Sequence, residues 1–128
     1  MRVLITGGTG SLGRALVAEC LADPTVARLK ILSRDEWKQA ELAAQYPDPR
    51  LQCLIGDVRD EARLRDAFRG MDVVIHAAAL KRVDAIAADP EEAIRTNVDG
   101  TTNVCRAARE AGVGRVVVVS SDKAVMPT

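Results

Sequence analysis

The fold is decided by the stretch Thr6-Gly7-Gly8-Thr9-Gly10-Ser11-Leu12-Gly13, which directly follows a short apolar run at residues 3–5. Gly7, Gly10 and Gly13 recur at every third position, and small residues there let a backbone turn tightly and approach a pyrophosphate. A helix beginning within this stretch would aim its N-terminal amides, which carry about half a positive charge, at the anion. No Gly-Lys-Ser/Thr follows, which excludes a P-loop. The stretch therefore predicts a strand, a phosphate-binding loop and a helix; the alternative is a turn that only lets the helix pack closely on a sheet.

Four more short runs rich in Val, Ile and Leu follow, at residues 29–32, 51–55, 73–75 and 116–119. Such runs are typical of strands buried on both faces, and hence of a parallel sheet. Four helical patterns separate the five runs. Strict alternation with right-handed crossovers predicts one α/β domain over residues 1–128, a doubly wound parallel sheet of the Rossmann type.

The helical patterns also predict which residues face the core. In the first helix these are Leu12, Ala15, Leu16 and Cys20, and in the third they are Leu64, Ala67 and Phe68, after an N-cap at Asp60. The second helix covers about residues 37–46. The longest helix is expected to begin at Asp89-Pro90 and to stop at Gly112. Its predicted buried stripe is Ile94, Asn97 or Val98, Thr101, Cys105 and Ala108.

Composition excludes several classes of function. The 128 residues include 18 Lys and Arg and 18 Asp and Glu, so the net charge is zero, which argues against nucleic acid or an anionic membrane as the main partner. Trp37, Tyr46 and Phe68 are the only aromatic residues, too few for base stacking. One histidine, His76, and three separated cysteines show no metal-ligand spacing, so we expect no metal. Without a secretion signal or a membrane-spanning segment, we expect a cytoplasmic domain.

The end of the second predicted strand bears on the choice of cofactor. About 20 residues past the glycine stretch, an NAD-binding fold usually places an acid for the ribose 2′-hydroxyl. Here that position is Ser33, followed by Arg34, with Lys38 one helical turn further on. Arg34 could pair with a 2′-phosphate, which predicts NADP, with NAD as the alternative. Asp35 could cap the next helix or repel the phosphate, and Arg34 could be a solvated surface charge.

Several motifs narrow the assignment. The glycine stretch resembles the cofactor loop of extended short-chain dehydrogenases. The whole chain resembles the NADP-dependent nucleotide-sugar 4,6-dehydratases of polysaccharide biosynthesis that act on UDP-N-acetylglucosamine. The motifs that carry this resemblance are Ser33-Arg34-Asp35-Glu36, Gly56-Asp57-Val58-Arg59-Asp60, His76-Ala77-Ala78-Ala79-Leu80-Lys81, Thr96-Asn97 and Ser120-Ser121-Asp122-Lys123-Ala124.

The resemblance implies roles for named residues. Asp57 and Val58 would border the adenine, and Lys81 would approach a phosphate or ribose, although a plain basic surface is the alternative for Lys81. Asp122 and Lys123 would be the acid–base pair of the elimination, with Ser121 bonding the sugar; the alternative is a solvated charge pair in a turn. The full cofactor-binding set is Gly7, Gly8, Thr9, Gly10, Ser11, Leu12, Gly13, Ser33, Arg34, Asp35, Lys38, Asp57, Val58, Ala77, Ala78, Ala79, Lys81 and Asn97.

The resemblance also implies an activity: oxidation of the sugar at C4, loss of water across C5 and C6, and return of the hydride to C6. The short-chain dehydrogenases carry a catalytic Tyr-x-x-x-Lys that these 128 residues lack, since Tyr46 is followed four positions later by Arg50. We therefore expect the cofactor-binding part of such an enzyme, inactive alone. The alternatives are a stand-alone dinucleotide-binding or regulatory module, or a nucleotide-sugar epimerase or reductase of the same superfamily. We also expect a homo-oligomer, because the strand at residues 116–119 would be an apolar edge.

Overall fold

The computed structural model describes residues 1–77 and 90–119, with only the backbone described over 90–97. Six of the predicted site residues lie outside the described residues: Ala78, Ala79, Lys81, Ser121, Asp122 and Lys123. Asn97 falls within a described helix, but its side chain does not belong to the described part.

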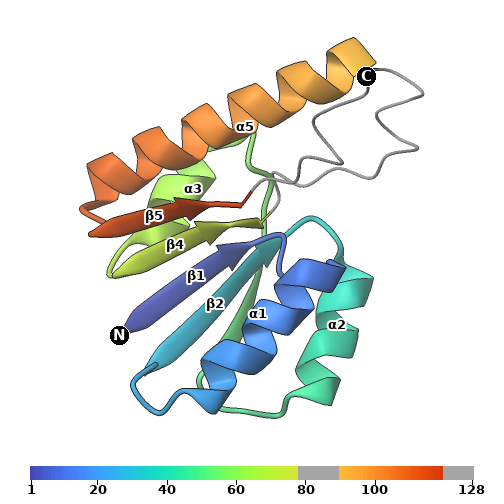
Figure 1. The fold of residues 1–128 in the computed structure, drawn as a ribbon, viewed down its shortest axis with the longest axis vertical. Coiled ribbons are helices and arrows are strands. Elements are labelled where there is room, and N and C mark those ends of the chain that lie inside the picture. Colours follow the sequence, from blue (N-terminus) through green and yellow to red (C-terminus); the bar gives the residue numbers. More distant parts are fainter. Residues whose placement is uncertain (78–89, 120–128) are drawn as a thin grey trace.

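Five parallel strands form a single sheet, as the sequence predicts (Figure 1). The sheet order is β3-β2-β1-β4-β5. The strands are β1 (Arg2–Thr6), β2 (Arg28–Ser33), β3 (Leu51–Ile55), β4 (Val73–His76) and β5 (Arg115–Val118). The chain runs outward from the central β1 to β2 and β3, and then returns to add β4 and β5 on the other side. The order therefore reverses at the carboxyl ends of β1 and β4, where ligands bind in open α/β sheets.

Helices cover both faces of this sheet. The helices α1 (Ser11–Ala22) and α2 (Glu36–Gln45) lie on one face, and α3 (Glu61–Phe68) and α5 (Pro90–Ala111) lie on the other (Figure 1). Each face has its own core of buried apolar side chains. The doubly wound prediction is therefore confirmed for the described residues.

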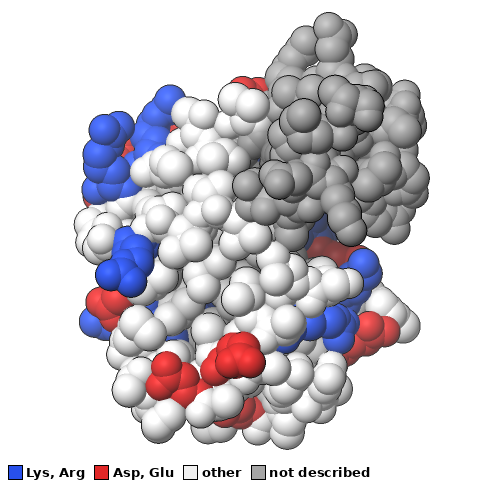
Figure 2. All heavy atoms as spheres, in the orientation of Figure 1, with Lys and Arg blue, Asp and Glu red and all other residues white. Residues whose placement is uncertain are grey.

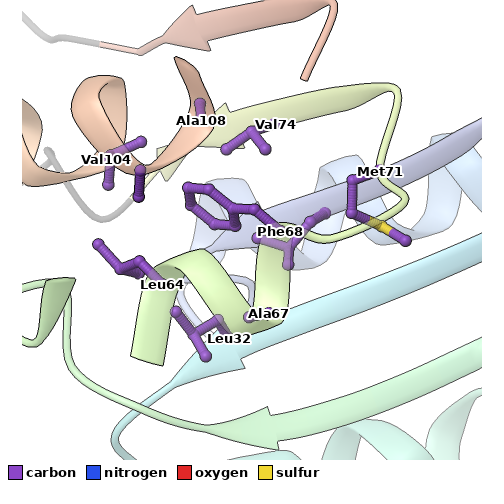
Figure 3. Close-up of a cluster of buried hydrophobic side chains, with 10 residues drawn as sticks. Leu32, Leu64, Ala67, Phe68, Met71, Val74, Val104 and Ala108 are labelled. Carbon is purple, nitrogen blue, oxygen red and sulfur yellow. The ribbon is translucent and has the colours of Figure 1, made fainter. Parts of the chain in front are cut away.

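The core beneath α3 and α5 is built around Phe68, whose side chain is fully buried (Figure 3). Its neighbours come from the sheet, from α3 and from α5, and include Val74, Leu64 and Val104. The predicted inward residues of α3 are confirmed, and Asp60 caps this helix by accepting a hydrogen bond from the Arg63 amide at 3.1 Å.

The predicted inward face of α1 is partly wrong. Ala15 is exposed, and the fully buried positions are Gly13 and Val17. Leu16 and Cys20 are only partly buried beside them. The face is displaced because Gly13 must lie against the glycine loop, which fixes the rotation of the helix about its axis.

The predicted stripe of α5 is confirmed at Ala108 and wrong at Val98 and Cys105. Val98 is 58% exposed and Cys105 is exposed, whereas Val104, Ala107 and Ala108 are buried. The small side chains of the two alanines let α5 approach α3 and the sheet closely. The helix ends at Ala111, before Gly112 with φ +77°, as predicted.

Candidate functional site

A cleft of about 1160 Å³ opens at the carboxyl ends of the central strands. Its walls are the β1–α1 loop, the β2–α2 turn, the β3–α3 turn and the end of β4. Predicted and unpredicted residues line it together: Gly7, Thr9, Gly10, Ser11, Leu12, Gly13, Arg14, Leu32, Ser33, Arg34, Asp35, Glu36, Lys38, Gly56, Asp57, Val58, Arg59 and Ala77. Its volume exceeds the range of about 300–1,000 Å³ that drug-sized ligands fill. The cleft is large enough for an extended ligand such as a dinucleotide.

The glycine loop is fixed by close backbone contacts. Gly7 has φ +73°, a conformation that favours glycine, and its amide donates to the Leu32 carbonyl at 2.9 Å. A β-carbon on Gly13 would overlap the Gly7 carbonyl oxygen and lie 2.5 Å from the Gly8 α-carbon. Gly8 itself packs on Ile31 and is not among the lining residues, so its part in the site is to let the loop lie flat on the sheet.

The N-terminus of α1 differs from those of α2 and α3. The latter two helices have aspartates as N-caps, Asp35 and Asp60, whose carboxylates each accept a hydrogen bond from a first-turn amide. By contrast, the N-cap of α1 is Gly10, so this helix has no side-chain cap, and it has no acid in its first turn. Its first amides therefore face the cleft with no side-chain acceptor from the cap position, which suits an anionic ligand.

Arg14 holds the loop from the side. Its Nε donates to the Thr9 carbonyl at 3.2 Å, and its other guanidinium nitrogens reach Gln45 at 3.1 Å and Glu41 at 3.4 Å. The side chain thus ties the loop to α2. Arg14 was not predicted, because an arginine in the first turn of a helix carries no pattern of its own.

Gln39 joins the ends of β2 and β3. Its side chain is 5% exposed, and its Nε2 donates to the Ser33 hydroxyl at 2.8 Å and to the Leu54 carbonyl at 2.7 Å. The Ser33 hydroxyl at the predicted ribose position is therefore oriented by Gln39. A buried glutamine in α2 was not predicted, since glutamine is usually a surface residue.

Charged residues surround the opposite wall. The Asp35 carboxylate accepts from the Lys38 amide at 3.0 Å, so it caps α2, one of the two roles predicted for it. The Arg34 side chain is 68% exposed, and its Nη1 lies 3.7 Å from Asp57 Oδ2. Arg59 is the nearer partner of Asp57, with its Nη2 at 2.8 Å from the same oxygen. Hydrogen bonds from Arg59 are the main reason that the pKa of the Asp57 carboxyl lies below its usual range.

The β3–α3 turn is supported from α5. Asn103 donates from Nδ2 to the Val58 carbonyl at 3.1 Å, and a β-carbon on Gly100 would lie 2.8 Å from Val58. Val58 therefore lines the cleft while it packs against the helix. Asn103 was not predicted, whereas Asn97 in the same helix was.

Beneath the loop, His76 connects the two central strands. It is 1% exposed, and its Nδ1 lies 2.7 Å from the Thr6 hydroxyl oxygen, with Thr6 and His76 paired in the register of β1 and β4. This buried contact gives the imidazole a structural role within the sheet.

Basic and acidic side chains lie close to one another on the face shown in Figure 2.

None of the helices in the described part of the chain is long and apolar enough to cross a membrane.

The fold and the cleft define a Rossmann-type α/β domain of the short-chain dehydrogenase kind. The model of the family described as polysaccharide biosynthesis protein matches residues 3–128, and the chain belongs to that family.

Individual relatives are similar over almost the whole chain. A UDP-glucose 4-epimerase of Rickettsia massiliae is 45% identical over 98% of the chain and 38% of its own length. A UDP-N-acetylglucosamine 4,6-dehydratase (inverting) of Campylobacter jejuni is 45% identical over 98% of the chain and 37% of its own length. The chain thus spans less than two fifths of these relatives.

Solved structures are similar to the chain in both fold and sequence. One is the dTDP-glucose 4,6-dehydratase DesIV of Streptomyces venezuelae, determined with NAD and TYD bound. It has a TM-score of 0.77 and 38% identity, and the match covers 91% of the present chain and 38% of the DesIV chain. Pen from Bacillus thuringiensis has a TM-score of 0.88 and 37% identity, and the match covers 98% of the present chain and 39% of the Pen chain.

Proposed function

We propose that this chain is the NADP-binding part of a nucleotide-sugar 4,6-dehydratase that acts on a UDP-N-acetylglucosamine-type substrate. The observation that carries the proposal is one cleft with an uncapped helix N-terminus on one wall and Arg34 and Lys38 on another. The 45% identity to the Campylobacter dehydratase supports the substrate class.

The residues of the cleft fit a dinucleotide. Gly10 is exposed, and the space beside its α-carbon is open, the nearest atom to an added β-carbon being the Gly7 carbonyl oxygen at 3.7 Å. A pyrophosphate can therefore approach the backbone of Gly10, Ser11 and Leu12. Val58 and Ala77 supply small apolar surfaces on the remaining walls.

The adenosine end favours NADP over NAD. Ser33 stands where an acid would bind the ribose 2′-hydroxyl, and the Asp35 carboxylate is turned onto its own helix. Arg34 and Lys38 therefore present positive charge where a 2′-phosphate would lie. A charge-assisted hydrogen bond is worth about 1.5–3 kcal/mol, or roughly ten- to a hundredfold in affinity.

A bound nicotinamide would supply the hydride acceptor and donor of the reaction. A ketone at C4 of the sugar acidifies the C5 proton, so elimination of water needs a base and an acid within hydrogen-bond reach. We assign these roles to Asp122 and Lys123, and the binding of the sugar to Ser121. These residues follow β5 in the sequence, and open α/β sheets bind ligands at the carboxyl ends of their strands.

The second candidate is a nucleotide-sugar 4-epimerase, favoured by the equal identity to the Rickettsia epimerase. The pair Asp122-Lys123 favours dehydration over epimerisation, because it resembles the acid–base pair of the 4,6-dehydratases. Within these 128 residues the only tyrosine, Tyr46, is the C-cap of α2, away from the cleft. We therefore expect cofactor binding without turnover of the sugar from these residues alone; turnover of UDP-N-acetylglucosamine by the 128-residue chain would contradict this.

The test is parallel calorimetric titration of the chain with NADP and NAD. We expect NADP to bind about tenfold more tightly, which is about 1.4 kcal/mol, and Arg34→Gln to abolish the difference. Arg65→Gln, which removes the same charge from an ion pair between α3 and α5, is the control. Calorimetry is preferred to tryptophan quenching because Trp37 is 77% exposed and is not among the lining residues. Equal binding would overturn the NADP assignment, and no binding would leave the loop as a fold element only.

A further inference from the structure

The β3–α3 turn fixes the direction of one carboxylate in the cleft. Asp57 Oδ1 accepts from the Arg59 amide at 2.9 Å, and the Asp60 amide donates to the Asp57 carbonyl at 2.9 Å. These two hydrogen bonds hold the Asp57 side chain in a tight turn, independently of its ion pairs with arginines. Its orientation is therefore set by the turn and not by a ligand.

Two arginines share this carboxylate unequally. Arg59 Nη2 lies 2.8 Å from Oδ2, and Arg59 Nε lies 3.2 Å from each carboxylate oxygen. Arg34 reaches Oδ2 only at 3.7 Å, beyond hydrogen-bond distance. Arg59 thus donates these side-chain hydrogen bonds to Asp57, whereas Arg34 forms only a longer ion pair with the same carboxylate.

The strand register explains why Arg34 stands beside Asp57. Ser33 of β2 pairs with Ile55 of β3, and the Gly56 amide donates to the Ser33 carbonyl at 3.0 Å. The residues that follow the two strands are therefore neighbours at the same edge. The Asp57 carboxylate therefore meets two guanidinium groups, those of Arg34 and Arg59. Two further carboxylates at this edge, Asp35 and Asp60, accept from amides of their own helices.

We propose that Arg59 controls the preference of the cleft for a 2′-phosphate: by occupying Asp57, it leaves Arg34 available to the phosphate. Without Arg59, the fixed carboxylate of Asp57 would draw Arg34 into a neutral pair and would itself repel the phosphate. Arg59 is then a positioning residue that acts through Asp57. This inference rests on the proposed function, since it concerns the same cleft.

The probes are 2′,5′-ADP (adenosine 2′,5′-bisphosphate) and 5′-AMP, which differ only in the 2′-phosphate. The measured quantity is the ratio of their dissociation constants, because general damage to the cleft weakens both ligands alike. We expect Arg59→Gln to lower the preference for 2′,5′-ADP about tenfold, or about 1.4 kcal/mol, and Arg59→Lys to retain most of it. Arg65→Gln is the matched charge control, and thermal melting verifies folding of each variant.

The double variant Asp57→Asn/Arg59→Gln separates the two ways in which Arg59 could act. Removal of the carboxylate restores the preference if Arg59 acts through Asp57. If the preference stays low in the double variant, Arg59 contacts the phosphate itself and the inference is overturned.

The remaining outcomes are also decisive. An unchanged ratio in Arg59→Gln overturns the role of Arg59 while leaving the proposed function intact. A wild-type chain that binds both probes equally overturns the NADP assignment and this inference with it. A wild-type chain that binds neither probe overturns the cofactor-binding function.

Discussion

Gly13 of α1 lies so close to Gly7 of the loop that a β-carbon on Gly13 would overlap the Gly7 carbonyl oxygen. The same β-carbon would lie 2.5 Å from the α-carbon of Gly8. Both neighbours are backbone, which cannot move aside like a flexible side chain. The first turn of α1 and the loop therefore form one rigid piece, and its shape sets where the uncapped amides point.

Gly13→Ala is expected to lower the free energy of unfolding by about 1–3 kcal/mol, the usual cost of overpacking. It should also weaken NADP binding, because the loop must shift. Gly10→Ala is the matched variant: its added β-carbon meets only the Gly7 carbonyl oxygen at 3.7 Å. Stability should therefore fall less than in Gly13→Ala, by the loss of a glycine N-cap alone, while NADP binding falls. Urea denaturation and calorimetry measure the two effects. Equal stability of both variants would contradict the close packing at Gly13.

The strands and the glycine loop could be predicted because their signals are local. The apolar run at residues 3–5 and the spacing of Gly7, Gly10 and Gly13 need no knowledge of distant residues. Asp60 could be predicted as a cap for the same reason. The rotation of α1 could not, because Ala15 is as compatible with burial as with exposure and only the contact of Gly13 with the loop decides between them.

The residues that donate hydrogen bonds to distant backbone groups could not be predicted from the sequence either. Gln39 and Asn103 each donate to a carbonyl near or beyond the end of β3, at Leu54 and Val58. Each has the sequence appearance of a surface residue in a helix. Their role depends on which strand end the helix crosses, which is a tertiary property.

Gln39→Leu is expected to lower the free energy of unfolding by about 1–3 kcal/mol, because it leaves the Leu54 carbonyl and the Ser33 hydroxyl without their donor. Gln39→Glu should be more damaging at neutral pH, since a carboxylate cannot donate to either oxygen and is buried beside them. Urea denaturation of the three proteins checks this order. If Gln39→Glu were the more stable variant, the donor role of Gln39 would be wrong.

Acid should destabilise the protein through Asp48, among other carboxylates. Hydrogen bonds from Arg50 hold the pKa of the Asp48 carboxyl below its usual 3.8. Since the folded-state pKa is the lower one, the ionised form stabilises the fold above the unfolded value, and this contribution is lost as the pH falls through the folded value. Stability should therefore change little from this source between pH 7 and about 5 and should fall below about pH 4.

Asp48→Asn tests this assignment. The variant should be less stable than the wild type at pH 7, and the difference should shrink below about pH 4 as the wild-type carboxyl gains its proton. Asp66→Asn, which removes a charge from an exposed ion pair with Arg69 at 3.4 Å, is the control. Urea denaturation from pH 7 to pH 3 provides the measurement. A difference independent of pH would exclude Asp48 as a source of acid sensitivity.

The edge strand β5 should make the 128-residue chain associate. Within the described residues β5 pairs only with β4, and its Val117 and Val118 are 40% and 43% exposed. Unpaired backbone groups beside apolar side chains favour pairing with a second strand. We expect a mass that rises with concentration in light scattering, and Val117→Lys should return the chain to a monomer. Ile55→Lys, on the opposite edge strand β3, carries the same charge change at a residue that is 46% exposed. Because it leaves β5 intact it should still associate, so a monomeric Ile55→Lys would move the interface to β3, and a monomeric wild type would exclude association through either edge.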